Sequence, residues 1–145
     1  MTKVAVVRQL EGEVLVLLRR ARRATADRAR SIHPDLAAAG YLVLAHLDEH
    51  PAGSQAQLAE ALGMDKGAVS RQVQVLGDLG LVEKSEDPDD RRACIVSLTA
   101  DGSARMTALA AERRTAYVER FQDWTEDELS LLVGQLGRYN RTLER

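Results

Sequence analysis

The segment that most constrains the fold of this chain runs from residue 54 to residue 99, where two short helical patterns precede two strand patterns. Ser54 and Gln57 have the spacing of a capping box at the start of the first helix, and Gly63 can adopt the left-handed conformation that ends it. Asp65 is placed to cap the second helix, whose apolar residues keep the 3.6-residue period. Because so few residues separate the two helices, they must cross sharply, as in a helix-turn-helix.

Two strand patterns follow the second helix. They cover residues 81–84 and 94–98, and a charged, proline-containing loop of residues 86–92 joins them. Such a hairpin after a helix-turn-helix predicts a mainly α fold with a small antiparallel β-wing, which is typical of proteins that bind double-stranded DNA. No aromatic residue lies within 54–99, which argues against single-stranded nucleic acid as the ligand, since its bases stack on aromatic rings.

The outer face of the second helix carries residue types that recognise base edges. The candidate DNA-binding residues on it are Lys66, Gly67, Ser70, Arg71 and Gln74. Arginine pairs with guanine, glutamine with adenine, and serine with either. Glycine costs about 0.5–1 kcal/mol in a helix, so Gly67 is best explained if a groove wall comes close to it. The alternative is the ordinary polar face of an amphipathic helix, but a hairpin tip with Arg91 and Arg92 beside this helix favours DNA contact.

Two sequence runs are specific enough to identify a family. They are AVSRQVQVLGDLGLVEK at residues 68–84 and DPDDRRACIVSLTADG at residues 87–102. The first resembles the recognition helix and first wing strand of the MarR family of winged-helix transcription regulators, and the second resembles the wing signature of that family. The resemblance implies that Asp90 and Arg92, with Arg91 between them, form an Asp-x-Arg pair. Arg92 would then enter the minor groove, and Asp90 would orient the wing or its arginine. It also implies that Thr99 and Gly102 open the next helix.

Length and composition agree with one domain over residues 1–145. A chain of this length can bury one sizeable core, and 45% hydrophobic with 29% charged residues is ordinary for a globular protein. No run of about 18 apolar residues is present to span a membrane, and Glu11 and Glu13 interrupt the apolar start in a way that a secretory signal does not. The single cysteine, Cys94, cannot form an intrachain disulfide, which favours a cytoplasmic location.

The net charge of −2 is not that of a strongly basic nucleic-acid binder. Even within residues 54–99, five basic side chains stand against eight acidic ones. We therefore expect the position of the basic groups to matter more than their sum, and DNA binding to depend strongly on salt. The acidic balance also keeps an alternative open, in which a dimeric winged-helix module binds another protein and does not read DNA. An upstream arginine cluster, residues 19–30, is expected to be a solvated helix face.

Apolar stripes on the terminal helices predict a homodimer. The first helix should end where His33 precedes Pro34, and a capping box at Thr125 and Glu128 opens the last helix. The predicted dimerisation residues are Val7, Val14, Leu129, Leu132, Leu136 and Leu143. A twofold dimer matches a palindromic operator. We therefore expect residues 33–102 to bind DNA, and residues 1–32 with 103–145 to dimerise. The alternative is a monomer that folds these helices onto its own module.

Other residues suggest sites that the sequence does not support further. His46 and His50 have i, i+4 spacing, but no third metal ligand has suitable spacing, so we expect a surface pair and no metal. Cys94 alternates with Val96 and Leu98 on a strand face that we expect to be buried. Peroxide-sensing members of the family carry their reactive cysteine in the first helix, where this chain has none. Glycine-rich phosphate loops and nucleophile-elbow motifs are absent, so we expect no enzyme, catalytic residue or cofactor.

The MarR resemblance also implies an effector. Members of the family commonly bind small aromatic or phenolic acids between the dimerisation helices and the winged module, which shifts the dimer away from its DNA-competent spacing. The candidates for binding a carboxylate-bearing aromatic are His33, Tyr41 and Arg30, although Tyr41 is better explained as a core residue. On this interpretation the protein is a repressor that a small molecule releases from DNA.

Overall fold

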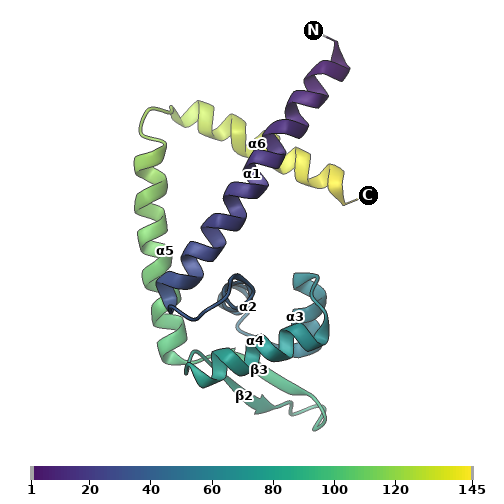
Figure 1. Ribbon diagram of the computed structural model, residues 1–145, viewed down its shortest axis with the longest axis vertical. Coiled ribbons are helices and arrows are strands. Elements are labelled where there is room, and N and C mark those ends of the chain that lie inside the picture. The colour runs from purple at the N-terminus through teal and green to yellow at the C-terminus, as the bar shows by residue number, and fades with distance from the viewer. Residues whose placement is uncertain (1, 145) are drawn as a thin grey trace. The chain divides into compact units, whose positions relative to one another are not determined.

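The computed structural model describes residues 2–144, and the chain divides into two compact units, one ending at Leu109 and one beginning at Ala110. The fold is mainly α with a small antiparallel sheet, as predicted (Figure 1). In chain order, the elements are α1 (Lys3–Ile32), α2 (Ala38–Glu49), β1 (Ala52–Ser54), α3 (Gln55–Leu62), α4 (Lys66–Asp78), β2 (Val82–Glu86), β3 (Cys94–Leu98), α5 (Ala100–Arg120) and α6 (Glu126–Leu143).

Helix α1 enters the core of the first unit only through its last turns. Thr2 caps its start, and it ends at Ile32 because His33 is held extended before Pro34. The buried residues of α1 are Ala29 and Ile32, and most of its apolar side chains nearer the N-terminus are exposed, with Val14 and Val16 half-buried. Although α1 has 30 residues, neither it nor any other helix within residues 2–144 is long and apolar enough to cross a membrane.

The helix-turn-helix forms as the local sequence signals predict. Ser54 and Gln57 make a complete capping box at the start of α3, with N–H···O distances of 2.8 and 3.2 Å. Gly63 ends α3 at a φ of 60°, the left-handed region that glycine adopts without steric cost. The carboxylate of Asp65 caps α4 by accepting a 2.7 Å hydrogen bond from the Ala68 N–H. The turn between α3 and α4 is therefore fixed at both ends.

The sheet has one strand that the sequence analysis missed. Its order is β1-β3-β2, and both pairings are antiparallel, so β3 is the central strand. The three-residue β1 was not predicted, because it is too short to show alternation. The prediction that the first wing strand covers residues 81–84 was wrong at both ends. The strand begins at Val82 and continues to Glu86, which still pairs with Cys94. The hairpin of β2 and β3 reaches out from the helices, with its loop at the lower edge of Figure 1.

The core of the first unit joins α2, α3, α4 and the sheet with the last turns of α1 and the first half of α5. Its largest fully buried side chains are Leu44, Leu47, Leu58, Leu76, Leu81, Val43, Val69, Val73 and Val96. Three of these, Val69, Val73 and Leu76, form the inward stripe of α4. Because this stripe is buried, the rotation of α4 about its own axis is fixed and its opposite face points outward.

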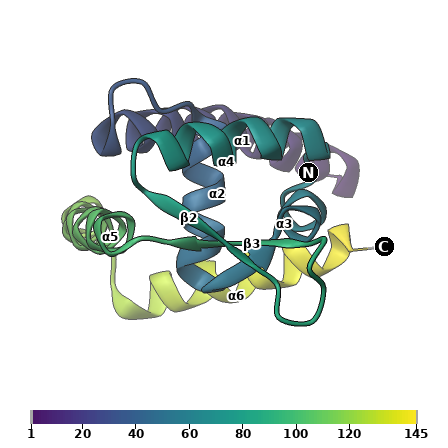
Figure 2. The ribbon, with the colours of Figure 1, turned by 90° about the horizontal axis from the view of Figure 1, so that it is seen from below.

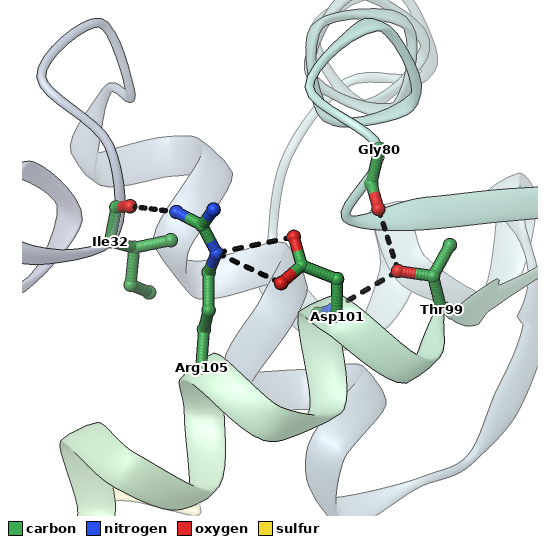
Figure 3. Close-up of polar contacts among 6 residues, drawn as sticks. Ile32, Gly80, Thr99, Asp101 and Arg105 are labelled. Atoms are coloured by element: carbon green, nitrogen blue, oxygen red, sulfur yellow. Dashed lines mark hydrogen bonds and ion pairs between the residues drawn. The ribbon is translucent and has the colours of Figure 1, made fainter.

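The start of α5 is tied to the end of α4 (Figure 3). The Thr99 hydroxyl donates to the Gly80 carbonyl at 2.6 Å and accepts from the Gly102 N–H at 3.0 Å, while the Thr99 N–H donates to the Leu81 carbonyl at 3.1 Å. Gly80 itself has a φ of 72°. A Cβ at Gly102 would lie only 2.1 Å from the Leu81 carbonyl oxygen, so this close approach requires glycine. Thr99 and Gly102 open α5, as the family resemblance implied.

The second unit contains the end of α5 and helix α6. Phe121 stacks on Tyr117 with ring centroids 6.0 Å apart and meets Trp124 edge-on at 5.4 Å. Thr125 and Glu128 form the predicted capping box at the start of α6. Hydrogen bonds from the Thr125 backbone and side chain lower the pKa of Glu128, because they stabilise its carboxylate. Helix α6 has no buried residue among those the structure describes.

We expect Gly102→Ala to lower the free energy of unfolding by about 1–3 kcal/mol, because the new methyl group must displace the Leu81 backbone. The matched control is Gly77→Ala in α4, where a Cβ meets no atom within 4 Å. Greater helix propensity should make that variant more stable by about 0.5–1 kcal/mol. Urea denaturation at one fixed protein concentration measures both. A Gly102→Ala variant as stable as the wild type would show that the Leu81 backbone can move aside at no cost.

Candidate nucleic-acid interface

The outward face of α4 presents the polar residues that the sequence analysis selected. Burial of Val69, Val73 and Leu76 leaves the opposite side of the helix open. The exposed residues on this side are Lys66, Gly67, Ser70, Arg71 and Gln74. The helix therefore carries one apolar and one polar face, and all five predicted residues lie outside the core.

Gly67 has a neighbour within the protein that the sequence did not show. A Cβ at this position would lie 3.2 Å from Asp65 Oδ1 and 3.4 Å from Arg71 Nη1. The missing side chain therefore leaves room for the Arg71 guanidinium to lie back over the first turn of α4, beside the capping carboxylate. This finding adds a second physical reason for glycine to the close approach of a groove wall.

The later turns of α4 show one polar contact and one exposed apolar side chain. The Gln74 amide donates to Asp78 Oδ1 at 3.0 Å, which orients the amide one turn before the end of the helix. Val75 is 38% exposed and was not singled out from the sequence. It falls off the stripe formed by Val69, Val73 and Leu76, and that departure from the period was the available signal. An exposed apolar side chain is the type that contacts a thymine methyl group.

The wing loop is a tight turn held by aspartate side chains. Asp90 Oδ1 accepts from the Arg92 N–H at 2.9 Å, and the Asp90 carbonyl accepts from the Ala93 N–H at the same distance. Asp87 Oδ1 accepts from the Asp89 N–H at 2.9 Å. The Asp90 carboxylate thus bonds the backbone of the turn, which is one of the two roles that the family resemblance implied. Asp90, Arg91 and Arg92 are all exposed.

Helix α4 and the wing lie on the same side of the first unit. Figure 2 views this side directly and shows α4 beside the β2–β3 hairpin. The exposed basic residues of the two elements are Lys66, Arg71, Lys84, Arg91 and Arg92. Of the nearby carboxylates, Asp65 caps α4 and Asp90 closes the wing turn, so both have partners within the protein. A polar helix and a thin, arginine-bearing hairpin are the shapes that fit a major and a minor groove.

The candidate effector residues have different surroundings. Tyr41 is 4% exposed and belongs to the core, as the alternative interpretation held. Arg30 pairs with Asp27, and His33 Nδ1 accepts from the Asp35 N–H at 3.2 Å. Tyr41 is therefore part of the core, whereas Arg30 lies at the surface near the end of α1.

The remaining predicted sites are also located by the structure. The imidazole rings of His46 and His50 stack with centroids 4.5 Å apart. Within residues 2–144, no group of three or more His, Cys, Asp or Glu side chains is placed to hold a metal ion. Cys94 is half-buried on the central strand. Of the predicted dimerisation residues, Val7, Leu136 and Leu143 are exposed, and the half-buried ones are Val14, Leu129 and Leu132.

Comparison with known proteins agrees with this geometry. A family model described as MarR family matches residues 35–93. An uncharacterized HTH-type transcriptional regulator of Bacillus subtilis, YxaD, is 27% identical over 135 residues, which are 93% of each chain. The crystal structure of a probable transcriptional regulator from Pseudomonas aeruginosa is 30% identical, with a TM-score of 0.65, covering 90% of this chain and 98% of the other. The crystal structure of the MarR family transcription regulator SP03579 has a TM-score of 0.82 at 23% identity, covering 97% of this chain and 94% of the other.

Proposed function

This chain belongs to the MarR family of transcription regulators, and we propose that it acts as a homodimer that binds a palindromic double-stranded operator. The observation that carries this proposal is the joint presentation of the polar face of α4 and the arginine-bearing wing on one side of the first unit (Figure 2). In the proposal, residues 33–102 form the DNA-binding part, and residues 1–32 and 103–145 form the dimerisation part.

We assign α4 to the major groove. The N-terminal residues of a recognition helix contact base edges, and Ser70, Arg71 and Gln74 supply the donors and acceptors for that contact. Lys66 at the start of the helix is placed to contact a phosphate, and Gly67 leaves space there. A solved structure of the same fold is known with operator DNA bound: a mutant of MarR from Escherichia coli, with a TM-score of 0.69 at 23% identity, covering 96% of this chain and 99% of the other.

We assign the wing to the minor groove. A two-stranded hairpin tip is thin, and narrow A·T-rich minor grooves concentrate negative potential that attracts arginine. In this assignment Arg92 enters the groove, Arg91 lies beside it, and Asp90 keeps the turn in shape through its bond to the Arg92 N–H. Such a contact responds to groove width more than to base identity.

The homodimer is inferred from apolar surface that neither unit covers internally. The N-terminal two thirds of α1 and all of α6 lack buried residues among those described. Exposed apolar faces on long helices usually mark an interaction surface. Two copies related by a twofold axis would cover the faces of both helices and place two α4 helices on successive major grooves.

We further propose that the protein is a repressor that a small aromatic acid releases from DNA. Two relatives support this direction. NicR of Pseudomonas putida, 37% identical over 76 residues that cover 52% of this chain and 48% of NicR, is a transcriptional repressor. The DNA binding of BpsR from Bordetella bronchiseptica, 28% identical with a TM-score of 0.63, covering 88% of this chain and 98% of the other, is regulated by 6-hydroxynicotinic acid. Because Tyr41 is buried, Arg30 and His33 are the residues we assign to the acid.

The net charge of −2 favours a second candidate, a dimeric winged-helix module that binds protein. Titration of the purified protein against the intergenic DNA beside its own gene separates the two. The DNA-binding proposal expects tighter binding to that fragment than to random DNA of equal length, with an affinity that falls steeply as salt rises. Equal affinity for both fragments at every salt concentration would favour the protein-interaction module.

We expect Leu136→Glu to dissociate the dimer, because it places a charge in the apolar seam of α6. Leu136 is exposed within its own unit, so the substitution should leave the fold of the subunit intact. Gln135→Glu is the matched control, since it adds the same charge at the neighbouring exposed position and should not affect assembly. Sedimentation velocity measures the result, and a Leu136→Glu protein that remains dimeric would remove α6 from the interface.

Arg71 and Lys66 should have separable effects on DNA binding. Arg71→Ala should cost about 1–3 kcal/mol on the operator and relax the preference at one base pair, because it removes a base contact. Lys66→Ala should weaken binding to all DNA fragments similarly and reduce the salt slope by about one unit, because it removes a phosphate contact. A base-substitution series read by fluorescence anisotropy measures both. If Arg71→Ala weakened every fragment equally, its assignment would be wrong.

Arg92→Ala should reduce operator affinity most where the flanking sequence is A·T-rich, because the narrow groove there attracts the guanidinium. Asp90→Ala should produce a smaller loss of the same kind, since Arg92 remains but its turn loses the carboxylate bond. Both variants should keep the wild-type oligomeric state and circular dichroism spectrum. Equal affinity of the wild type and Arg92→Ala at low salt would exclude the wing from DNA binding.

A further inference from the structure

The first turns of α5 contact the last residue of α1. Arg105, one turn into α5, donates from Nη1 to the Ile32 carbonyl oxygen at 2.8 Å, although 73 positions separate the two residues (Figure 3). Asp101 holds the same guanidinium, with its carboxylate oxygens 3.3 and 3.2 Å from Arg105 Nε. The last carbonyls of a helix lack partners within the helix, and a cation there is favourable. Arg105 therefore caps α1 from another element.

The same segment of α5 holds the end of the recognition helix. Thr99 bonds the carbonyls of Gly80 and Leu81, which lie two and three residues beyond the end of α4, and Gly102 packs against the Leu81 carbonyl. Thus one stretch of seven residues, 99–105, contacts the C-terminal ends of both α1 and α4. The Arg105 side chain is 45% exposed, so its main contribution is this polar link and not the filling of core volume.

The length of α1 makes the angle at this link important. Val7, in the predicted dimer seam, precedes Ile32 by 25 residues, or about 38 Å of helix at about 1.5 Å per residue. A rotation of about 5° at the Ile32 end would displace Val7 by roughly 3 Å along such a lever. The rise of one base pair is about 3.4 Å. A small change in the angle of α1 at Ile32 thus moves the far end of the helix by about the rise of one base pair.

We propose that Arg105 is a positioning residue that sets the spacing between the two recognition helices of the dimer, by fixing the end of α1 against the turn of α5 that holds α4. The inference rests on the proposed function, because it requires a dimer through α1 and a two-part operator. Arg105 itself does not contact DNA in this proposal. Asp101 orients the Arg105 guanidinium. The dimer held in this way selects palindromic operators with one fixed separation of half-sites.

The experiment measures operator spacing with the full-length protein. Fluorescence anisotropy gives the affinity for the native operator, for versions with one base pair inserted or removed at the centre, and for a single half-site in random DNA. We expect the wild type to lose at least tenfold in affinity when the spacing changes. Arg105→Met keeps the aliphatic stem but removes the donors. It should reduce the discrimination, meaning the loss of affinity when the spacing changes, to threefold or less. Its half-site affinity should stay within twofold of the wild type.

Three variants accompany Arg105→Met. Arg105→Lys retains a donor for the Ile32 carbonyl and should restore most of the discrimination. Asp101→Asn removes the charge that orients the guanidinium and should lose part of it. Arg114→Met, at an exposed arginine further along α5, removes the same charge and should discriminate as the wild type does. Thermal unfolding of each variant shows whether the fold is kept, and if Arg105→Met does not fold, Asp101→Asn and Arg105→Lys decide the question.

The outcomes separate this inference from the proposed function. If the wild type prefers no operator over random DNA, the proposed function fails and this inference fails with it. If the wild type binds the operator but tolerates every spacing, or if folded Arg105→Met or Asp101→Asn discriminates as the wild type does, only the inference is overturned. A loss of affinity that is equal for the half-site and for all spacings would also overturn it, because such a loss indicates direct DNA contact or general weakening.

Discussion

The burial of one face of α4 determines which of its side chains face outward from the first unit. Val69, Val73 and Leu76 are fully buried, so the rotation of the helix about its axis is set by the core. Its two ends are then fixed by polar contacts, since Asp65 caps the start and Thr99 binds the carbonyls that follow the end. These contacts together set the direction in which every exposed side chain of α4 points. A surface that reads DNA must be held this firmly, because base recognition depends on donors and acceptors at defined positions.

The acidic composition and the proposed DNA contact are compatible because several carboxylates have structural roles. Asp65 caps α4, Asp78 orients the Gln74 amide, and Asp90 closes the wing turn. Each of these carboxylates accepts a hydrogen bond from a donor within the protein. Net charge describes association at long range, whereas recognition depends on which groups remain without internal partners and face the groove. Because the exposed cations are few, recognition at this proposed interface depends more on the shape of the surface and the position of each cation than on total charge.

Local signals predicted most of the fold, and non-local contacts account for what was missed. The capping boxes at Ser54 and Thr125 and the stop at Gly63 were correct, because each depends on residues three or four positions apart. Strand β1 was missed because only its pairing with β3, about forty residues later, makes its three residues a strand. The bond from Arg105 to Ile32 joins residues 73 positions apart, so no periodic pattern in the sequence indicates it. The polar face of α4 was predicted from the sequence. The space that Gly67 leaves for the Arg71 guanidinium was not, because it depends on where the Arg71 side chain lies.

Helix α1 has two different environments along its length, and in the proposed dimer this division links assembly to DNA recognition. Its last turns belong to the core through Ala29 and Ile32, while most of its earlier apolar residues are exposed and none of them is buried. In the proposed dimer, a contact that covers the exposed part is connected to the winged part through one continuous helix of 30 residues. The last turns of α1 are held by the packing of Ala29 and Ile32 in the core, and the Ile32 carbonyl also accepts the bond from Arg105, to which we assign the angle of α1. In the proposed dimer, a ligand that altered the surroundings of this turn would change the separation of the recognition helices without touching DNA, because a ligand shifts an equilibrium by preferring one of two conformations.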